Sequence, residues 1–308
     1  GHVPNAPFKL FDAAGDLLAL RPDVTMQVAR LCATRLRGQE GPFKFRYTQR
    51  VFREADARAA SRELTQIGLE NIGPEGPDAD AEVVGLFAEA LRAAGLEGFK
   101  IAIGTVGVLR ALLETCPAPG DWKNEVLAAY HSSDFLRLDE LCAEEGIPTA
   151  FARAIAALPY IRGGEEAIQQ ARDLADPLGC GRGLGDLQVT YEKLCDEGLS
   201  DNLLVDFSIM SSFDYYTGIV FEAFAPDAGA SLGSGGRYDG MLAAYDGARR
   251  PAAGFAFYLE QVMAALAKGA PAKRPLRIAV PKGSLNADTI RVLAEAGLDT
   301  TGLDEPGR

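Results

Sequence analysis

Apolar and polar positions alternate with the period of a β-strand in the first third of the chain. This pattern predicts strands at residues 17–20, 43–52 and 62–72. Residues 25–37 have helical spacing, and residues 80–94 form an amphipathic helix that Gly95 closes. The opening of the chain therefore predicts an antiparallel sheet with helices packed against it.

The middle of the chain changes to helical spacing. A strand at residues 100–103 leads into a helix at 106–113, and from 122 to 199 the pattern is helical almost throughout, interrupted by Gly and Pro. We expect a helical insertion at about residues 120–200 with a hydrophobic core of its own. Strand character returns at residues 203–209 and 218–224, and a glycine-rich run at 233–236 precedes a last helix at 255–267.

The end of the chain has a separate organisation. Residues 268–275 are rich in Ala, Lys and Pro, as is typical of a linker. A strand at 276–280, a turn at 281–284 and a helix at 285–296 follow. Because a lone strand, turn and helix cannot bury an apolar face, we expect residues 276–308 to be the truncated start of a further domain, after a main domain at 1–267.

Composition narrows the classes of protein. The 308 residues contain no apolar run long enough for a membrane span and no signal peptide at the start, which favours a cytoplasmic protein. Five scattered cysteines without a C-x-x-C pair indicate reduced thiols, and two histidines argue against a zinc site, although a carboxylate site for magnesium stays open. A net charge of -12 argues against tRNA or DNA as a partner. A local basic patch is still conceivable on the strand that carries Lys44, Arg46, Arg50 and Arg53.

Six segments carry a resemblance to a known family. They are Leu20-Arg21-Pro22-Asp23-Val24-Thr25, Val51-Phe52-Arg53-Glu54, Gln66-Ile67-Gly68-Leu69-Glu70, Phe213-Asp214-Tyr215-Tyr216-Thr217-Gly218, Gly235-Gly236-Arg237-Tyr238-Asp239-Gly240 and Gly254-Phe255-Ala256. Each one alone is an ordinary strand or turn. Together and in this order they resemble the catalytic core of histidyl-tRNA synthetases, which implies an α+β fold built on the antiparallel sheet of class II aminoacyl-tRNA synthetases, flanked by helices and with a helical insertion.

The chemistry of these segments suits a small zwitterion. A free amino acid offers a carboxylate to a guanidinium and an ammonium group to carboxylates, while an imidazole adds two ring nitrogens and a flat face. Arg53 suits that carboxylate or, as the resemblance also implies, a phosphate. Gln66 and Glu70 share a strand face because their separation is even, about 13 Å apart at ~3.3 Å per residue. The resemblance adds four residues that line a histidine pocket: Asp23, Thr25, Tyr215 and Tyr216.

The glycine-rich run has a second reading as a phosphate-binding loop. The G-x-x-x-x-G-K-[ST] pattern is missing, and no G-x-G-x-x-G opens a helix after a strand. We therefore expect the run to let the backbone approach a ligand or a neighbouring strand closely.

Departures from the synthetase pattern decide the expected activity. Ser211 stands where these enzymes begin a block with a catalytic arginine, and Gln261 stands where a second arginine clamps the ATP phosphates. Ala55 replaces an acidic residue of the second motif. Loss of two such cations removes several kcal/mol of transition-state stabilisation. Adenylation of histidine is therefore not expected, and no catalytic residue is assigned.

A histidine pocket without the features for ATP and tRNA resembles the regulatory subunits of ATP phosphoribosyltransferase. The tail, residues 276–285, is similar to the first strand and turn of the catalytic subunit of that enzyme. The resemblance implies a chain that is not catalytic by itself, activates the catalytic subunit and mediates feedback by histidine in the first step of histidine biosynthesis. It implies a homodimer within a hetero-oligomer, histidine as ligand, no tRNA, no membrane, no cofactor on this chain, and Mg²⁺ only in the catalytic partner.

Two rival interpretations remain. The first is an active histidyl-tRNA synthetase-like ligase that forms histidyl adenylate, against which Ser211 and Gln261 argue. The second is a purely structural partner whose pocket is vestigial. The residues also leave open whether feedback histidine binds in this pocket, at the subunit interface or on the catalytic domain.

Overall fold

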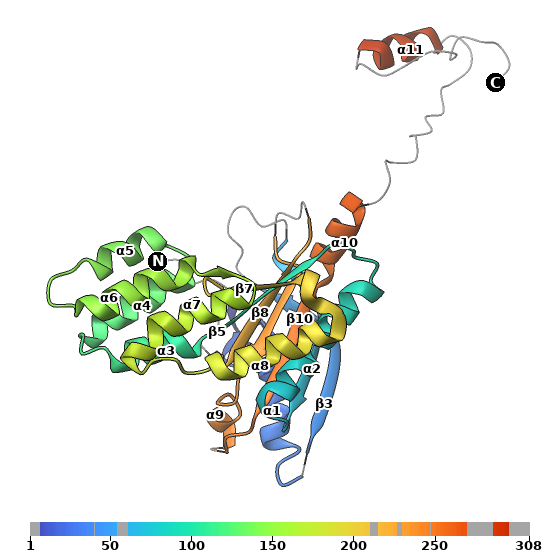
Figure 1. The fold of residues 1–308 in the computed structure, drawn as a ribbon. Helices are drawn as coiled ribbons and strands as arrows, with labels where there is room; N and C mark the ends of the chain where they lie inside the picture. Colours follow the sequence, from blue (N-terminus) through green and yellow to red (C-terminus); the bar gives the residue numbers. More distant parts are fainter. Residues whose placement is uncertain are drawn as a thin grey trace. The chain divides into compact units, whose positions relative to one another are not determined.

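A mixed β-sheet is the centre of the larger of two units (Figure 1). The computed structural model describes residues 7–39, 41–53, 61–209, 215–226, 230–246, 248–269 and 286–295. The chain divides into Gly1–Lys268 and Gly269–Arg308. Each unit is described by itself.

Within the described residues the sheet has eight strands, in the order β3-β4-β10-β9-β8-β5-β7-β6. Their bounds are β3 Phe43–Phe52, β4 Glu63–Ile72, β10 Ala252–Tyr258, β9 Gly233–Arg237, β8 Ile219–Phe224, β5 Lys100–Thr105, β7 Leu203–Asp206 and β6 Arg162–Gly163. Neighbours pair antiparallel except β5 with β7, which are parallel. The expected antiparallel α+β fold is thus confirmed, with one parallel pair.

The helices fall into two groups. The first group surrounds the sheet: α1 Thr25–Thr34, α2 Gly76–Ala93, α8 Leu184–Leu194, α9 Ala243–Asp246 and α10 Leu259–Gly269. The second group gathers beyond β5 and β7 (Figure 1): α3 Gly107–Thr115, α4 Gly120–His131, α5 Phe135–Cys142, α6 Thr149–Ala157 and α7 Glu165–Ala175. None of the helices in the described ranges is long and apolar enough to cross a membrane.

The main core lies between α2 and one face of the sheet. The ring of Phe87 in α2 stacks on Phe257 with 4.5 Å between centroids, and it contacts Phe221 and Phe255 at 5.1 Å. Phe255 and Phe257 lie on β10 and Phe221 lies on β8, on the other side of β9, so one aromatic side chain fixes α2 over the centre of the sheet.

The expectation that the helical insertion has a core of its own is wrong. Its buried residues, among them Trp122, Ile155 and Ile168, belong to the same apolar cluster as Phe87 and Ile101. The insertion leaves the sheet after β5, adds the edge strand β6 and returns at β7, the neighbour of β5. Its apolar helix faces therefore press on the end of the existing core instead of closing a second one.

Several predicted boundaries shift. Residues 255–258, predicted as helix, extend β10, because β4 and β9 pair with it on both sides. The glycine-rich run is strand β9 and does approach neighbouring strands closely, as expected. The first predicted strand, β2 Leu17–Ala19, pairs with β1 Lys9–Phe11 in a separate two-stranded sheet, and β1 was not predicted.

The smaller unit contains helix α11, Asn286–Glu295, within the predicted helix at 285–296. The strand and turn predicted at 276–284 lie outside the described residues.

Candidate functional site

One face of β4 carries Gln66, Gly68 and Glu70, and the register of the sheet decides what lies beside them. Opposite these residues β10 places Tyr258, Ala256 and Gly254, in that order. On the far side of β10, β9 places Ser234 and Gly236. This face forms the floor of a hollow of about 310 Å³, open mouth included.

Glycine residues on β4, β9 and β10 leave space above this floor for larger neighbouring side chains. A Cβ on Gly254 would collide with the Glu70 carboxylate, and a Cβ on Gly68 would collide with the Tyr47 ring. A Cβ on Gly236 would come within 2.7 Å of the ring of Tyr216. The glycines are therefore required because larger side chains above them occupy the space of a Cβ atom.

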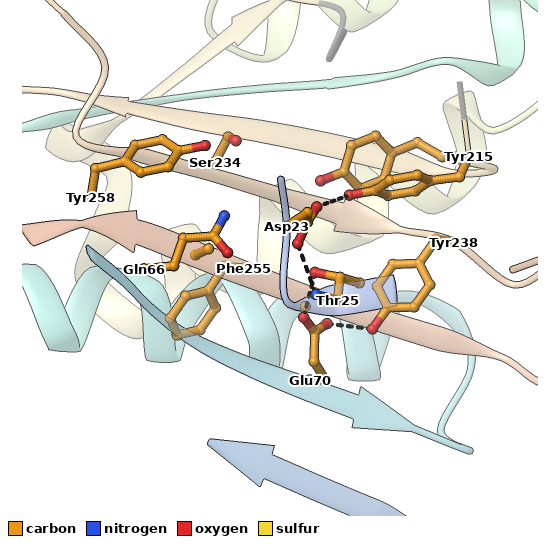
Figure 2. Close-up of a pocket in the computed structure, with 12 residues that line it drawn as sticks. Asp23, Thr25, Gln66, Glu70, Tyr215, Ser234, Tyr238, Phe255 and Tyr258 are labelled. Atoms are coloured by element: carbon orange, nitrogen blue, oxygen red, sulfur yellow. Dashed lines mark hydrogen bonds between the residues drawn. The ribbon is translucent and has the colours of Figure 1, made fainter. Parts of the chain in front are cut away.

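The deepest polar group is the carboxylate of Glu70, which is 1% exposed. Three hydroxyl groups donate to it, and Figure 2 shows those of Thr25 and Tyr238. Thr25 Oγ1 lies 2.7 Å from Oε1, Tyr47 Oη lies 3.1 Å from Oε1, and Tyr238 donates to Oε2. Burial raises the pKa of Glu70 to about 8, the three hydroxyl groups lower it and the nearby Asp23 raises it.

A second buried carboxylate, Asp23, lies between Glu70 and the aromatic wall. Its Oδ1 accepts from Thr25 N at 2.7 Å, and its Oδ2 accepts from the Tyr215 hydroxyl at 3.2 Å. Among the described residues no lysine or arginine is within ion-pair distance of Asp23 or Glu70. The hollow thus presents two carboxylates to whatever enters it, which favours a ligand with cationic or N–H groups.

The amide of Gln66 is fixed at the opposite end from Glu70. Its Oε1 accepts from Val24 N at 3.2 Å, which leaves the amide nitrogen directed towards the side of Ser234 and Tyr258 (Figure 2). Gln66 and Glu70 therefore bracket the hollow from the two ends of one strand face, as their even spacing predicts.

Aromatic rings form the wall. Tyr215 and Tyr216 have centroids 4.7 Å apart, and Tyr215 meets Tyr238 edge-on at 5.9 Å. Burial raises the pKa of the Tyr215, Tyr216 and Tyr238 hydroxyls, so they remain neutral donors at physiological pH. Flat faces and hydroxyl groups together suit a heteroaromatic ring with nitrogen atoms.

Of the residues predicted from the sequence, all but Arg53 line the hollow. Arg53 instead contacts a lining residue. Its Nε donates to Pro22 O at 2.8 Å and a terminal nitrogen donates to Tyr258 Oη at 2.7 Å. Its guanidinium therefore contacts Tyr258, a lining residue, and also lies 5.1 Å from the centroid of the Tyr258 ring.

The sequence interpretation missed the contributions of β9 and β10. These lining residues are Ser234, Tyr238, Gly254, Phe255, Ala256 and Tyr258. Tyr238, Gly254, Phe255 and Ala256 stand in segments noted as family blocks, whereas Ser234 and Tyr258 lie just outside them. Their place in the site follows only from the pairing of β4, β10 and β9.

The departures from the synthetase pattern are only partly visible. Gln261 lies in the first turns of α10, next to Glu260, whose carboxylate accepts from Thr65 N at 3.0 Å. Ser211 and Ala55 lie outside the described residues. Within the described ranges no group of three His, Cys, Asp or Glu side chains has the geometry to hold a metal ion.

Two of the four residues of the expected basic patch on β3 pair with acids, while Arg46 is exposed. Lys44 forms an ion pair with Glu82, and Arg50 lies 2.6 Å from Glu63. Arg53 is half-buried and donates to Pro22 O and Tyr258 Oη.

Comparison with protein families gives a match to the model for histidyl-tRNA synthetase over residues 1–262. A protein from Moorella thermoacetica, described as an ATP phosphoribosyltransferase regulatory subunit, is 39% identical over 268 residues, which are 87% of this chain and 69% of that protein.

Solved structures agree with the fold. One from Bacillus halodurans, described as an ATP phosphoribosyltransferase regulatory subunit/histidyl-tRNA synthetase, superposes with a TM-score of 0.77 at 28% identity, covering 97% of this chain and 79% of the other. An ATP phosphoribosyl transferase complex from Thermotoga maritima matches with a TM-score of 0.63 over 82% of this chain and 85% of the other. At 21% identity the latter match supports the fold alone.

Proposed function

Because the chain belongs to the histidyl-tRNA synthetase family, among the ATP phosphoribosyltransferase regulatory subunits, we propose that it activates a catalytic subunit and passes histidine feedback to it. The relatives' name identifies the enzyme, and the resemblance of the sequence implies its reaction, the condensation of ATP with phosphoribosyl pyrophosphate. This chain contributes the ligand pocket and the catalytic subunit contributes the chemistry.

The observation that carries the proposal is the paired buried carboxylates in a tyrosine-lined hollow. Histidine has an ammonium group and ring N–H groups, which need acceptors, and Asp23 and Glu70 supply them. The ring needs a flat apolar surface, which Tyr215, Tyr216 and Tyr238 supply. Histidine regulates the enzyme if it binds more tightly to the low-activity state of the complex than to the high-activity state.

The direct test is reconstitution. The catalytic subunit of the same organism is assayed for formation of phosphoribosyl-ATP alone, with this chain, and with this chain plus histidine. We expect activation by the chain and inhibition of the complex by histidine. A catalytic subunit that is equally active with and without the chain would contradict the proposal.

The rival ligase function is tested separately by pyrophosphate exchange with histidine and ATP. Gln261 is neutral where the synthetases aim a guanidinium at the triphosphate, so we expect no exchange above background. Measurable exchange would favour the ligase.

A homodimer is the oligomeric state we propose for the chain. The β1–β2 hairpin exposes every one of its strand residues, including Phe11 at 72% and Leu17 at 61%. A two-stranded hairpin is marginal in water by itself, and an exposed apolar patch indicates an interface. Twofold symmetry is the commonest way to cover such a patch with a second copy of itself.

Three further parts of the proposal concern the setting. The cysteines are all free thiols, which fits a cytoplasmic, reducing compartment. The tail is proposed as the start of a fused catalytic domain, from its resemblance alone. No cofactor is assigned to this chain, and any Mg²⁺ is assigned to the catalytic partner.

A further inference from the structure

The Glu70 carboxylate has an environment that is unusual for an ionised group. It is 1% exposed, and among the described residues it is in ion-pair distance of no lysine or arginine. A buried carboxylate without a cation costs several kcal/mol to ionise, and such a group takes up a proton instead. Burial is here the largest influence on Glu70 and raises its pKa to about 8.

The groups around Glu70 shift its protonation equilibrium in both directions. The hydroxyls of Thr25, Tyr47 and Tyr238 donate to its oxygens and favour the ionised form. The charge of Asp23 favours the protonated form. Titratable side chains face Glu70 from every element packed against it. They are Asp23 before α1, Cys32 on α1, Tyr47 on β3, Tyr215 and Tyr216 before β8, and Tyr238 after β9. The charge of Arg250 acts on Cys32.

On this geometry we propose that ligand binding in the pocket is linked to loss of a proton from Glu70, and that Tyr47 and Tyr238 are the positioning residues that set this linkage. The proposal rests on the proposed function in that histidine is the ligand. Without ligand the carboxyl is protonated. A cationic group of the ligand replaces the proton, the O–H bond of Glu70 breaks, and the proton passes to the buffer or to a ring nitrogen of the ligand.

The linkage makes histidine affinity depend on pH with a defined sign. Below about pH 8 part of the binding free energy is used to remove the proton, so affinity falls as pH falls, by up to tenfold per pH unit. Above about pH 8 Glu70 is already ionised and this dependence ends. Feedback by histidine is therefore weaker when the solution becomes more acidic.

The positioning role has a matched pair of variants. Tyr238→Phe removes a hydroxyl that favours the ionised form, so Glu70 holds its proton to higher pH. Loss of a hydrogen bond to a charged group raises the pKa of Glu70 by about one unit. We therefore expect histidine affinity at pH 7 to fall roughly tenfold and to approach that of the parent protein near pH 9. Tyr130→Phe removes an equally buried hydroxyl that donates to Phe207 O at 2.7 Å, outside the pocket, and should leave the pH profile unchanged.

The experiment is calorimetric titration with histidine from pH 5.5 to 9 on the parent protein, Tyr238→Phe, Tyr130→Phe and Glu70→Gln. Glu70→Gln has no carboxyl to titrate at this position, so any slope that it retains belongs to other groups, such as the ring and the ammonium group of histidine itself. In parallel, the carboxyl signal of Glu70 in ¹³C-glutamate protein, assigned by its loss in Glu70→Gln, should report protonated Glu70 at pH 7 and ionised Glu70 after histidine is added.

The outcomes separate this inference from the proposed function. Two results overturn the linkage alone. The first is a pH profile of binding that is the same in the parent protein and Glu70→Gln, and the second is a Glu70 carboxyl that is ionised at pH 7 without histidine. A profile that Tyr238→Phe and Tyr130→Phe alter equally overturns the positioning role. Absence of histidine binding at every pH overturns the proposed function and the linkage with it.

Discussion

Gly254 of β10 stands directly opposite Glu70 of β4, and a methyl group on Gly254 would collide with the Glu70 carboxylate and lie 2.5 Å from Leu69 O. The position of the deepest carboxylate in the hollow is thus decided by a missing side chain on the neighbouring strand. The glycine is part of the pocket although it offers no functional group.

Gly254→Ala should therefore displace the Glu70 carboxylate from the three hydroxyl groups that donate to it. We expect histidine affinity to fall at least tenfold and unfolding free energy to fall by about 1–3 kcal/mol, the usual cost of overpacking. Calorimetry and chemical denaturation measure the two effects. Gly240→Ala is the control, since a Cβ there meets nothing within 4 Å, and equal effects from the two variants would contradict the steric account.

Asp23→Asn tests whether the second carboxylate binds a cation. Asn keeps an oxygen to accept from Thr25 N, so the fold should be retained while the charge is lost. Removing one member of a buried charge pair typically costs about 2 kcal/mol or more, so we expect at least ~30-fold weaker histidine binding. Asp139→Asn, an exposed acid on α5, is the matched control, and an unchanged affinity for Asp23→Asn would argue against ammonium binding here.

Periodicity was sufficient to place Gln66 and Glu70 on one face, because side chains alternate strictly along a strand. It was insufficient for Tyr238 and Tyr258, since their place depends on how three distant strands align. The contact of Arg53 also could not be predicted from the sequence, because a guanidinium suits a ligand carboxylate and a tyrosine hydroxyl equally well. Only the structure shows that Arg53 contacts Tyr258.

The same limit applies to the fold. Helical spacing identified the insertion, yet it could not show that the insertion shares the core of the sheet, because an apolar helix face looks the same whichever surface it covers. At residues 255–258 apolar residues fit a helix or a buried strand, and pairing with β4 and β9 decided for the strand.

A buried ion pair holds the strand end that carries Tyr238. Arg237 Nη2 lies 2.6 Å from Asp80 Oδ1, with both side chains under 10% exposed. Asp80→Ala leaves the guanidinium with Asp239 as its remaining carboxylate, at 3.1 Å. We expect a loss of about 3 kcal/mol in unfolding free energy, measured by denaturant titration. Glu114→Ala, which breaks the exposed pair with Arg182, should cost no more than about 1 kcal/mol, and similar losses in both would refute the distinction.

The exposed hairpin gives a prediction about assembly. Phe11→Ser with Leu17→Ser removes two large apolar side chains that the fold of one chain leaves in water. We expect the parent protein to sediment as a dimer and the double variant to shift towards monomer, with little change in its far-UV circular dichroism. Leu136→Ser, at an equally exposed position on α5, controls for loss of surface hydrophobicity. A monomeric parent protein would contradict the dimer.

The central claim is that the hollow between β4, β9 and the segment before α1 binds one free histidine per chain. It is tested most directly by calorimetric titration of the parent protein with histidine at pH 8, near the pKa of Glu70, where the cost of removing its proton is small. We expect one site per chain and loss of that site in Asp23→Asn. We also expect a Kd below 1 mM, because a few buried polar contacts supply more than about 4 kcal/mol of binding free energy. No saturable heat at millimolar histidine, or a site that Asp23→Asn leaves untouched, would contradict it.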